Sequence, residues 1–364
     1  MSDSNLKWEP QYGIPPGWML EDHLQARGYS QAEFARRCNR SPKLISEIIA
    51  GKAPIEPATA LQFEKVLGLN AQIWVNIESK YQLFLAREAE SKKAEEESEW
   101  VRGFPINHLV KHGYISQPKT TADKVSTLLA FFRIASTDAW NAVYHHPKVA
   151  LRHSPSFRSD PKILATLLQI GVIKADEQFC LPYSKSKFRA AVRNIRELTC
   201  KPLVDALNEA QKLCNDAGVG LVLVEPINGA PLSGATWWTN PKTAVIQMTG
   251  RYKSNDHLWF TFFHEAAHIL LHSKKNIFLD GSNENHGTDI ELEANQWASN
   301  LLIPPKQWAV FTKLSSFSEK EIKTFAKELG IATGIVVGRL QHEEIIDWSH
   351  FNDLKESFNW DDFR

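Results

Sequence analysis

Residues 261–272 read Thr261-Phe262-Phe263-His264-Glu265-Ala266-Ala267-His268-Ile269-Leu270-Leu271-His272. Residues four apart on an α-helix lie on nearly the same face, about 6 Å apart along the axis, so His264 and His268 can direct ring nitrogens at one ion. Glu265 lies about 100° further round the helix, where it can touch a water on that ion without being a ligand. The spacing predicts a zinc site with Glu265 as general base. The alternative is a chance spacing or a structural histidine pair. The apolar flanks argue against it, because they predict a buried helix in which histidines need partners.

A catalytic zinc site needs a third protein ligand. The sequence offers one in a second helical pattern, residues 289–302, where Glu291 lies on a face of small residues. Asn295, one turn on, is a candidate to hydrogen-bond a ligating histidine. In the alternative interpretation, Glu291 closes a capping box with Thr288 and serves its own helix. Glu293 is the reserve ligand.

Several other polar residues lie near the proposed site in the sequence. His272 continues the four-residue series, but it lies about 12 Å along the axis from His264 and is interpreted as a helix-end histidine. Tyr252, His257 and Arg251 are candidates to stabilise an oxyanion.

The run His264–His268, followed by residues 291–304, resembles the ImmA/IrrE family of metallopeptidases. The family pattern is HExxH, then ExxAN, and a Leu-Leu-x-Pro ending. The resemblance covers roughly residues 200–345. It implies Zn²⁺ as cofactor, His264, His268 and Glu291 as its ligands, and Glu265 as the catalytic glutamate. It also implies a gluzincin-like endopeptidase, and several family members cleave a DNA-binding repressor.

Two short apolar runs before the motif predict strands, residues 219–224 and 243–249. A sheet beside a zinc site commonly offers an edge strand to an extended peptide. The strand around Ile246 is the candidate for that edge, and an ordinary core strand is the alternative.

A second informative region, residues 28–51, predicts two short helices joined by a tight turn. Ser30 and Ser41 are candidate N-caps, and Pro42 suits a first helical position. This pattern is typical of a helix-turn-helix, whose second helix can enter a major groove. The expected buried set is Phe34, Ala35, Leu44, Ile45 and Ile48. Residues from about 15 to 81 resemble the HigA-type branch of the Xre/lambda-repressor-like domains.

The charge of this region is modestly positive. From Ser30 to Lys52, five basic residues against two acidic ones leave an excess of three. Gln31, Lys43 and Ser46 are candidates to read bases, with Arg40 and Lys52 as further DNA-binding residues and dimerisation doubling the contacts. The alternative is a helical module that binds protein.

Composition sets the broad class of the chain. Its 364 residues carry no net charge, 43% are hydrophobic, and the four cysteines form no CxxC pair. No apolar run approaches the roughly 18 residues of a membrane span, so we expect a cytoplasmic protein with reduced thiols and no membrane partner. The expected fold is mainly α with a small β-sheet (α+β). It divides into a helix-turn-helix domain (1–87), a charged helical linker (88–100), a helical middle region (101–202) and a zincin-like metallopeptidase domain (203–364).

Together, the two resemblances imply a DNA-binding regulator that carries a peptidase. The first hypothesis is an antitoxin or autorepressor that binds the operator in its own promoter, with a homodimer as the candidate assembly and a cognate toxin as protein partner. The second is a dedicated protease that cleaves a partner repressor. The third is a non-catalytic zincin platform that binds and neutralises a toxin.

Overall fold

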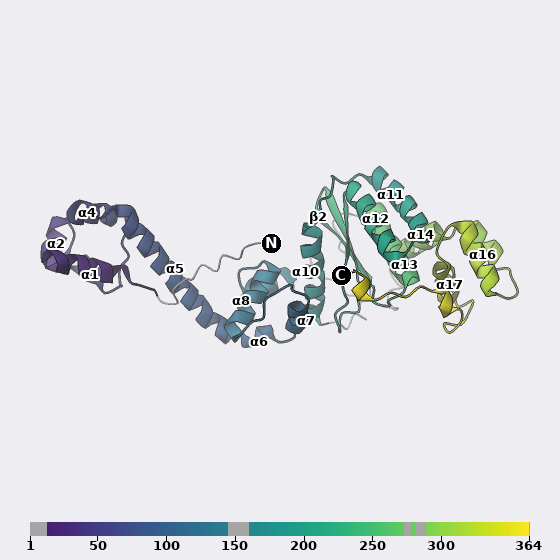
Figure 1. Cartoon of the computed structure of the whole chain (residues 1–364), viewed down its shortest axis with the longest axis horizontal. Helices are drawn as coiled ribbons and strands as arrows, with labels where there is room; N and C mark the ends of the chain where they lie inside the picture. Colours follow the sequence, from purple (N-terminus) through teal and green to yellow (C-terminus); the bar gives the residue numbers. More distant parts are fainter. Residues whose placement is uncertain (1–12, 145–159, 273–277, 281–288, 364) are drawn as a thin grey trace. The chain divides into compact units, whose positions relative to one another are not determined.

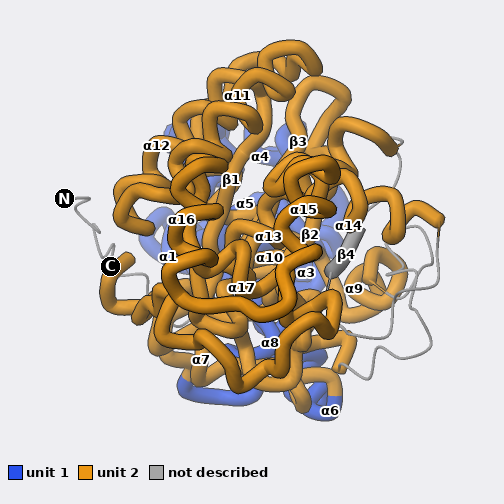
Figure 2. Tube along the Cα trace, turned by 90° about the vertical axis from the view of Figure 1, so that its right-hand side faces the viewer, with its two compact units in different colours: residues 1–99, 119–126 blue, residues 100–118, 127–364 orange. Residues whose placement is uncertain are grey.

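The computed structural model describes residues 13–144, 160–272, 278–280 and 289–363. The chain forms two compact units (Figure 2). The first holds residues 1–99 and 119–126, and the second holds residues 100–118 and 127–364. The four-part division expected from the sequence stays a prediction.

The helices that lie entirely in the first unit are α1 (Pro16–Arg27), α2 (Gln31–Arg37), α3 (Pro42–Ile49), α4 (Pro57–Leu67) and α5 (Ala71–Glu96). The hydroxyl of Ser30 accepts a hydrogen bond from the Glu33 amide, and that of Ser41 accepts one from the Leu44 amide. Both predicted N-caps are therefore present. The turn between α2 and α3 places Asn39 at φ 52°, a left-handed conformation that asparagine tolerates better than most residues.

The core of the first unit is aromatic at its centre. The rings of Phe34 and Phe63 lie 5.0 Å apart, and those of Phe63 and Trp74 lie 5.5 Å apart. All three side chains are fully buried. Four of the five residues expected to be buried are so, and Leu44 is half-buried. The charged run after Leu85 continues α5 as far as Glu96.

Further helices lie between α5 and the sheet in the chain. They are α6 (Ser98–Val101), α7 (Ile106–Lys111), α8 (Thr121–Phe132), α9 (Thr137–Tyr144), α10 (Pro161–Asp176), α11 (Lys185–Leu198) and α12 (Leu203–Asp216). The boundary between the units passes through α6 and α8. Within the second unit, the rings of Phe104, Phe132 and Trp140 pack together.

A small sheet lies at the centre of the second unit (Figure 1). Its strands are β1 (Val219–Leu223), β2 (Gly234–Asn240), β3 (Thr243–Met248) and β4 (Phe278–Asp280), in the order β1-β3-β2-β4. β1 and β3 are parallel, and the other pairs are antiparallel. The prediction that the strand around Ile246 is an edge is wrong, because β3 pairs with β1 on one side and β2 on the other. β2 was not expected as a strand, and β1 and β4 are the outer strands.

The helices that follow complete the second unit: α13 (Asn255–Leu271), α14 (Asp289–Leu302), α15 (Pro305–Phe311), α16 (Glu319–Leu329) and α17 (Thr333–His342), with two 3₁₀ turns (Asn352–Leu354 and Trp360–Phe363). α13 packs against α14, α17, β2 and β3. The predicted fold class, mainly α with a small sheet, is confirmed. Among the described residues, no helix is both long and apolar enough to cross a membrane.

Candidate metal centre

α13 is the central helix of the second unit and is buried almost throughout. Phe262, Phe263 and the neighbouring aliphatic residues pack into the core on several sides. His264 and His268 are each 2% exposed, and Glu265 is fully buried. Polar side chains this deep must have specific partners, since burial without them costs several kcal/mol.

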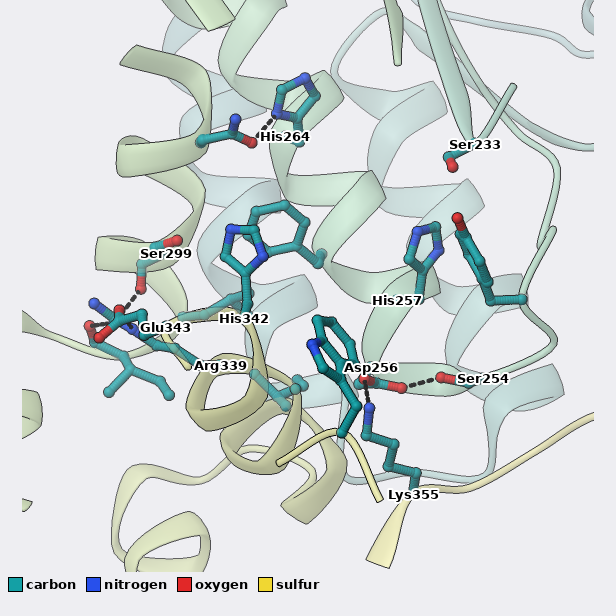
Figure 3. Close-up of a pocket in the computed structure, with 18 of the residues that line it drawn as sticks. Ser233, Ser254, Asp256, His257, His264, Ser299, Arg339, His342, Glu343 and Lys355 are labelled. Carbon is teal, nitrogen blue, oxygen red and sulfur yellow. Dashed lines mark hydrogen bonds and ion pairs between the residues drawn. The ribbon is translucent and has the colours of Figure 1, made fainter. Parts of the chain in front are cut away.

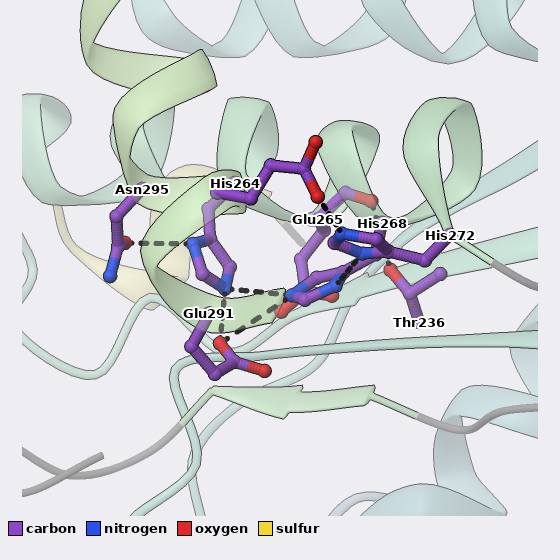
Figure 4. Close-up of polar contacts among 8 residues, drawn as sticks. Thr236, His264, Glu265, His268, His272, Glu291 and Asn295 are labelled. Atoms are coloured by element: carbon purple, nitrogen blue, oxygen red, sulfur yellow. Dashed lines mark hydrogen bonds and ion pairs between the residues drawn. The ribbon is translucent and has the colours of Figure 1, made fainter. Parts of the chain in front are cut away.

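The partners of the two histidines lie on α14 (Figure 4). The Nε2 atoms of His264 and His268 are 3.0 Å apart. Oε2 of Glu291 lies 3.2 Å from Nε2 of His264 and 3.6 Å from Nε2 of His268. Three ligands at the usual 2.0 to 2.1 Å from a tetrahedral zinc ion would be roughly 3.3 Å apart. Two imidazole nitrogens and one carboxylate oxygen thus fit a zinc ion in composition and spacing.

The protonation of this cluster suits a cation. Burial lowers the pKa of His268 to about 4, so its imidazole is neutral near pH 7. Burial would raise the pKa of Glu291, but the interactions with His264 and His268 outweigh it and lower that pKa to about 2. Neutral imidazole and ionised carboxylate are the forms that bind metal.

Small residues let α14 approach α13. Ala294 and Ala298 are fully buried between Glu291 and the end of the helix. Oδ1 of Asn295 lies 2.9 Å from Nδ1 of His264, so the structure brings together the amide and the histidine that the sequence paired. The alternative capping role of Glu291 involves Thr288, which lies outside the described residues.

His272 has a contact that the sequence interpretation missed. It ends α13, as expected, yet its Nδ1 lies 2.9 Å from Nδ1 of His268. Its Nε2 lies 3.2 Å from Oε2 of Glu293, the reserve ligand. Glu293 therefore contacts His272 and lies outside the group of His264, His268 and Glu291 that could hold an ion. The four-residue spacing from His268 was the available sequence signal.

Glu265 lies between α13 and the sheet. A Cβ atom built on Gly234 of β2 would lie 2.5 Å from Oε1 of Glu265 and 2.6 Å from Thr261. The glycine therefore leaves the space that the carboxylate fills. From the same strand, the hydroxyl of Thr236 donates to the backbone carbonyl of Glu265 at 3.4 Å.

A cavity of about 660 Å³ opens beside the cluster (Figure 3). His264, Glu291 and Asn295 line one end. Of the oxyanion candidates, Tyr252 and His257 also line it, with rings 4.3 Å apart. Arg251 is not among the lining residues, and its Nη1 donates to the carbonyl of Pro231.

The outer wall of the cavity comes from residues late in the chain. Lys355 forms an ion pair with Asp256 at 2.8 Å, and Trp348 is 62% exposed. Arg339 of α17 also lines the cavity. It forms an ion pair with Glu343 and donates to the carbonyls of Ser299 and Ile303. No local sequence pattern marked residues 342–355 as part of this cavity.

The residues proposed to touch DNA lie on one stretch of the first unit. Gln31, Ser46 and Lys52 are exposed. The side chain of Lys43 is 83% exposed and lies 3.7 Å from that of Glu47. Arg40 is half-buried, and its Nε donates to Oε1 of Gln62 at 2.6 Å, which ties it to α4. Their roles at DNA stay predictions.

Comparison with known proteins finds two family matches in the chain. The sequence model of the IrrE N-terminal-like domain (Peptidase_M78) matches residues 215–341, and that of the helix-turn-helix family (HTH_3) matches residues 20–74. The uncharacterized HTH-type transcriptional regulator YddM of Escherichia coli (strain K12) is 31% identical over 68 residues, which are 19% of this chain and 72% of the relative. The chain belongs to the helix-turn-helix regulators and carries an IrrE-like domain. Both resemblances predicted from the sequence are confirmed.

Further proteins are similar to part of the chain. Virulence-associated protein I of Dichelobacter nodosus is 34% identical over 76 residues, 21% of this chain and 70% of that protein. A structure of Pseudomonas aeruginosa antitoxin HigA with the higBA promoter shares 30% identity and covers 24% of this chain and 95% of its own, with a TM-score of 0.22. An addiction module antidote protein of a HigA family from Coxiella burnetii shares 27% identity over 23% of this chain and 94% of its own, with a TM-score of 0.22.

Proposed function

We propose that this helix-turn-helix regulator is also a zinc-dependent endopeptidase. The convergence of His264, His268 and Glu291 within 4.8 Å of one another, inside an IrrE-like domain, is the observation that carries the proposal. These three side chains would hold the ion. Bound zinc supplies a Lewis acid that polarises water and carbonyl oxygens.

The remaining chemistry belongs to residues of the chain. Glu265 is the general base: its carboxylate takes a proton from the attacking water and passes it to the leaving amine. Asn295 holds His264 in orientation through Nδ1. Tyr252 and His257 lie on the cavity wall and are the candidates to donate hydrogen bonds to the carbonyl oxygen of a peptide.

The first unit supplies DNA binding in this proposal. Support comes from the helix-turn-helix match, the relationship to a transcriptional regulator, and the exposed side chains of Gln31, Lys43 and Ser46. The expected target is the operator of its own promoter. The antitoxin role, with a cognate toxin as protein partner, follows from the HigA-type resemblance of the same residues.

Purified protein tests the peptidase proposal directly. It should contain zinc by elemental analysis and cleave a protein encoded beside its own gene, whereas Glu265→Gln should keep the metal and lose cleavage. Zinc without any cleavage would favour a non-catalytic platform that holds a toxin. Protein that neither contains nor binds zinc would refute the metal centre.

A further inference from the structure

A chain of three side chains leads from the metal cluster to the surface. Nδ1 of His268 lies 2.9 Å from Nδ1 of His272, and Nε2 of His272 lies 3.2 Å from Oε2 of Glu293. We infer that His272 is a positioning residue, which holds His268 in the tautomer that presents Nε2 to a metal ion. This inference rests on the proposed zinc site.

Hydrogen-bond chemistry fixes the direction of the chain. A carboxylate can only accept, so His272 must donate from Nε2–H to Glu293. Nδ1 of neutral His272 is then an acceptor, and the proton between the two rings must belong to Nδ1 of His268. His268 is left with its lone pair on Nε2, the atom that lies 3.6 Å from Glu291.

The other histidine reaches the same tautomer by a separate route. Oδ1 of Asn295 accepts from Nδ1–H of His264, which leaves Nε2 of His264 facing the cluster. Each metal-facing histidine therefore has its own acceptor behind it: an amide on α14 for His264 and a second imidazole for His268. Such outer partners orient a ligating ring and raise its basicity.

The burial of His272 matches this role better than that of an ordinary helix-end histidine. Its side chain is 7% exposed although its backbone ends α13. Glu293 is 60% exposed, so solvent screens the outer link. We therefore expect the inner bond, from His268 to His272, to contribute most of the effect on metal binding.

Two substitutions separate the inner bond from the outer one. In His272→Asn, the amide oxygen occupies the position of Nδ1 and can still accept from His268. In His272→Gln, the amide lies where Nε2 was, and the inner bond is lost. Zinc affinity of the full chain, measured by competition with a chromophoric chelator, should fall about 10- to 100-fold in His272→Ala and His272→Gln. His272→Asn should recover most of that loss.

Two variants on α14 test whether the negative charge of Glu293 matters by itself. Glu293→Gln should weaken zinc binding by a smaller factor than His272→Ala. Asp289→Asn removes the same charge from the first turn of α14 and should leave the affinity unchanged. The absorption spectrum of the Co²⁺-loaded protein should change in His272→Gln and stay close to wild type in His272→Asn. Thermal melting of the metal-free proteins checks that each variant folds.

The outcomes distinguish the two proposals. Wild-type protein without zinc affinity would refute the metal centre and this inference with it. Wild-type protein that binds zinc, with His272→Ala and His272→Gln binding equally tightly, would refute the role of His272 alone. Equal losses in His272→Asn and His272→Gln would also overturn it, because side-chain packing and not the inner hydrogen bond would then be responsible.

Discussion

At the scale of single residues, the cluster on α13 and α14 is a set of buried polar atoms with few alternatives. His264 and His268 sit in an apolar helix and meet a carboxylate from α14 that is 19% exposed. Removal of one member would leave the others buried with incomplete hydrogen bonding, at a cost of about 1 to 3 kcal/mol. Metal affinity should therefore depend on each of these three side chains.

Single substitutions should separate ligands from neighbours. Wild-type protein should hold about one zinc ion per chain, and alanine at His264, His268 or Glu291 should each lower that occupancy. Glu293→Ala should stay fully occupied at saturating zinc, since Glu293 contacts His272 and lies outside the group of His264, His268 and Glu291 that could hold an ion. Metal analysis after equilibrium dialysis against excess zinc measures both. Full occupancy in Glu291→Ala together with loss in Glu293→Ala would reverse the assignment.

The general base should be separable from the ligands. Glu265→Gln preserves shape and removes the proton acceptor, so cleavage should fall about 10²- to 10⁴-fold while zinc content stays at the wild-type level. Timed digestion of a substrate protein, with metal analysis of the same samples, gives both numbers. Cleavage at the wild-type rate would show that another group takes the proton.

At the scale of elements, the contact between β2 and α13 places Glu265. Gly234 permits this contact, because a Cβ there would meet the Glu265 carboxylate and Thr261 within 2.6 Å. Gly220, a glycine in β1, serves as a comparison: a Cβ atom built there would lie 3.6 Å from its nearest neighbour, Gln178. The two positions differ in the space available and not in the type of element.

This difference gives a matched pair of variants. Gly234→Ala should destabilise the protein by about 1 to 3 kcal/mol through overpacking and should reduce cleavage, because the Glu265 carboxylate must move. Gly220→Ala should change both much less. Urea unfolding and the cleavage assay measure the two effects. Equal stability of the two variants would mean that the β2–α13 contact accommodates the added methyl group without loss of stability.

Arg196 of α11 holds the ends of two other helices. Its guanidinium donates to the carbonyls of Leu301 and Leu302 at the end of α14, at 2.8 to 3.1 Å. A further bond reaches the carbonyl of Leu329 at the end of α16, at 2.9 Å. A cation at a helix C-terminus satisfies carbonyls that the helix leaves unpaired.

Loss of this contact should lower the stability of the protein. Arg196→Met keeps the aliphatic stem but leaves those carbonyls without the guanidinium, and should lower the free energy of unfolding by about 2 to 4 kcal/mol. Arg193→Met, in the same helix and exposed, is the control. Chemical denaturation of the metal-free proteins measures the difference, and equal unfolding midpoints would contradict the capping role.

At the scale of the whole molecule, the two units have separate cores. Phe34, Phe63 and Trp74 belong to the core of the first, and α13 and its neighbours form the core of the second. A fragment that ends after Glu96 keeps α1 to α5, which contain the buried aromatic residues of the first core. DNA binding should therefore survive without the IrrE-like domain.

We expect that fragment to bind the DNA upstream of its own gene in preference to random sequence. Lys43→Ala or Gln31→Ala should weaken binding by about 1 to 3 kcal/mol if each contacts a base, and His264→Ala in the full chain should leave it nearly intact. Mobility-shift titrations at fixed salt measure this. Equal affinity for random DNA would instead favour a protein-binding module.

The sequence by itself determined the local features. Because His264 and His268 are four residues apart, helix geometry places their rings on the same face. Ser30 and Ser41 cap helices because the first amides of a helix have no partner within it. The buried faces of α2, α3 and α14 follow from periodicity. The pattern of residues 289–302 already offered Glu291 as the third ligand, with a capping role as the alternative, and the family resemblance implied the same ligand set.

Tertiary structure decided what depends on distant segments. β3 became an interior strand because β2, which carried no recognised strand pattern, pairs along it. His272 gained its contact with Glu293 because α14 packs beside the end of α13. The cavity wall at Trp348 and Lys355 arises because Ser357 pairs with Ser254, just before α13, and Lys355 forms an ion pair with Asp256 in the first turn of that helix. Helical spacing reports neighbours within one element, whereas these contacts join residues tens of positions apart, whose proximity only packing sets.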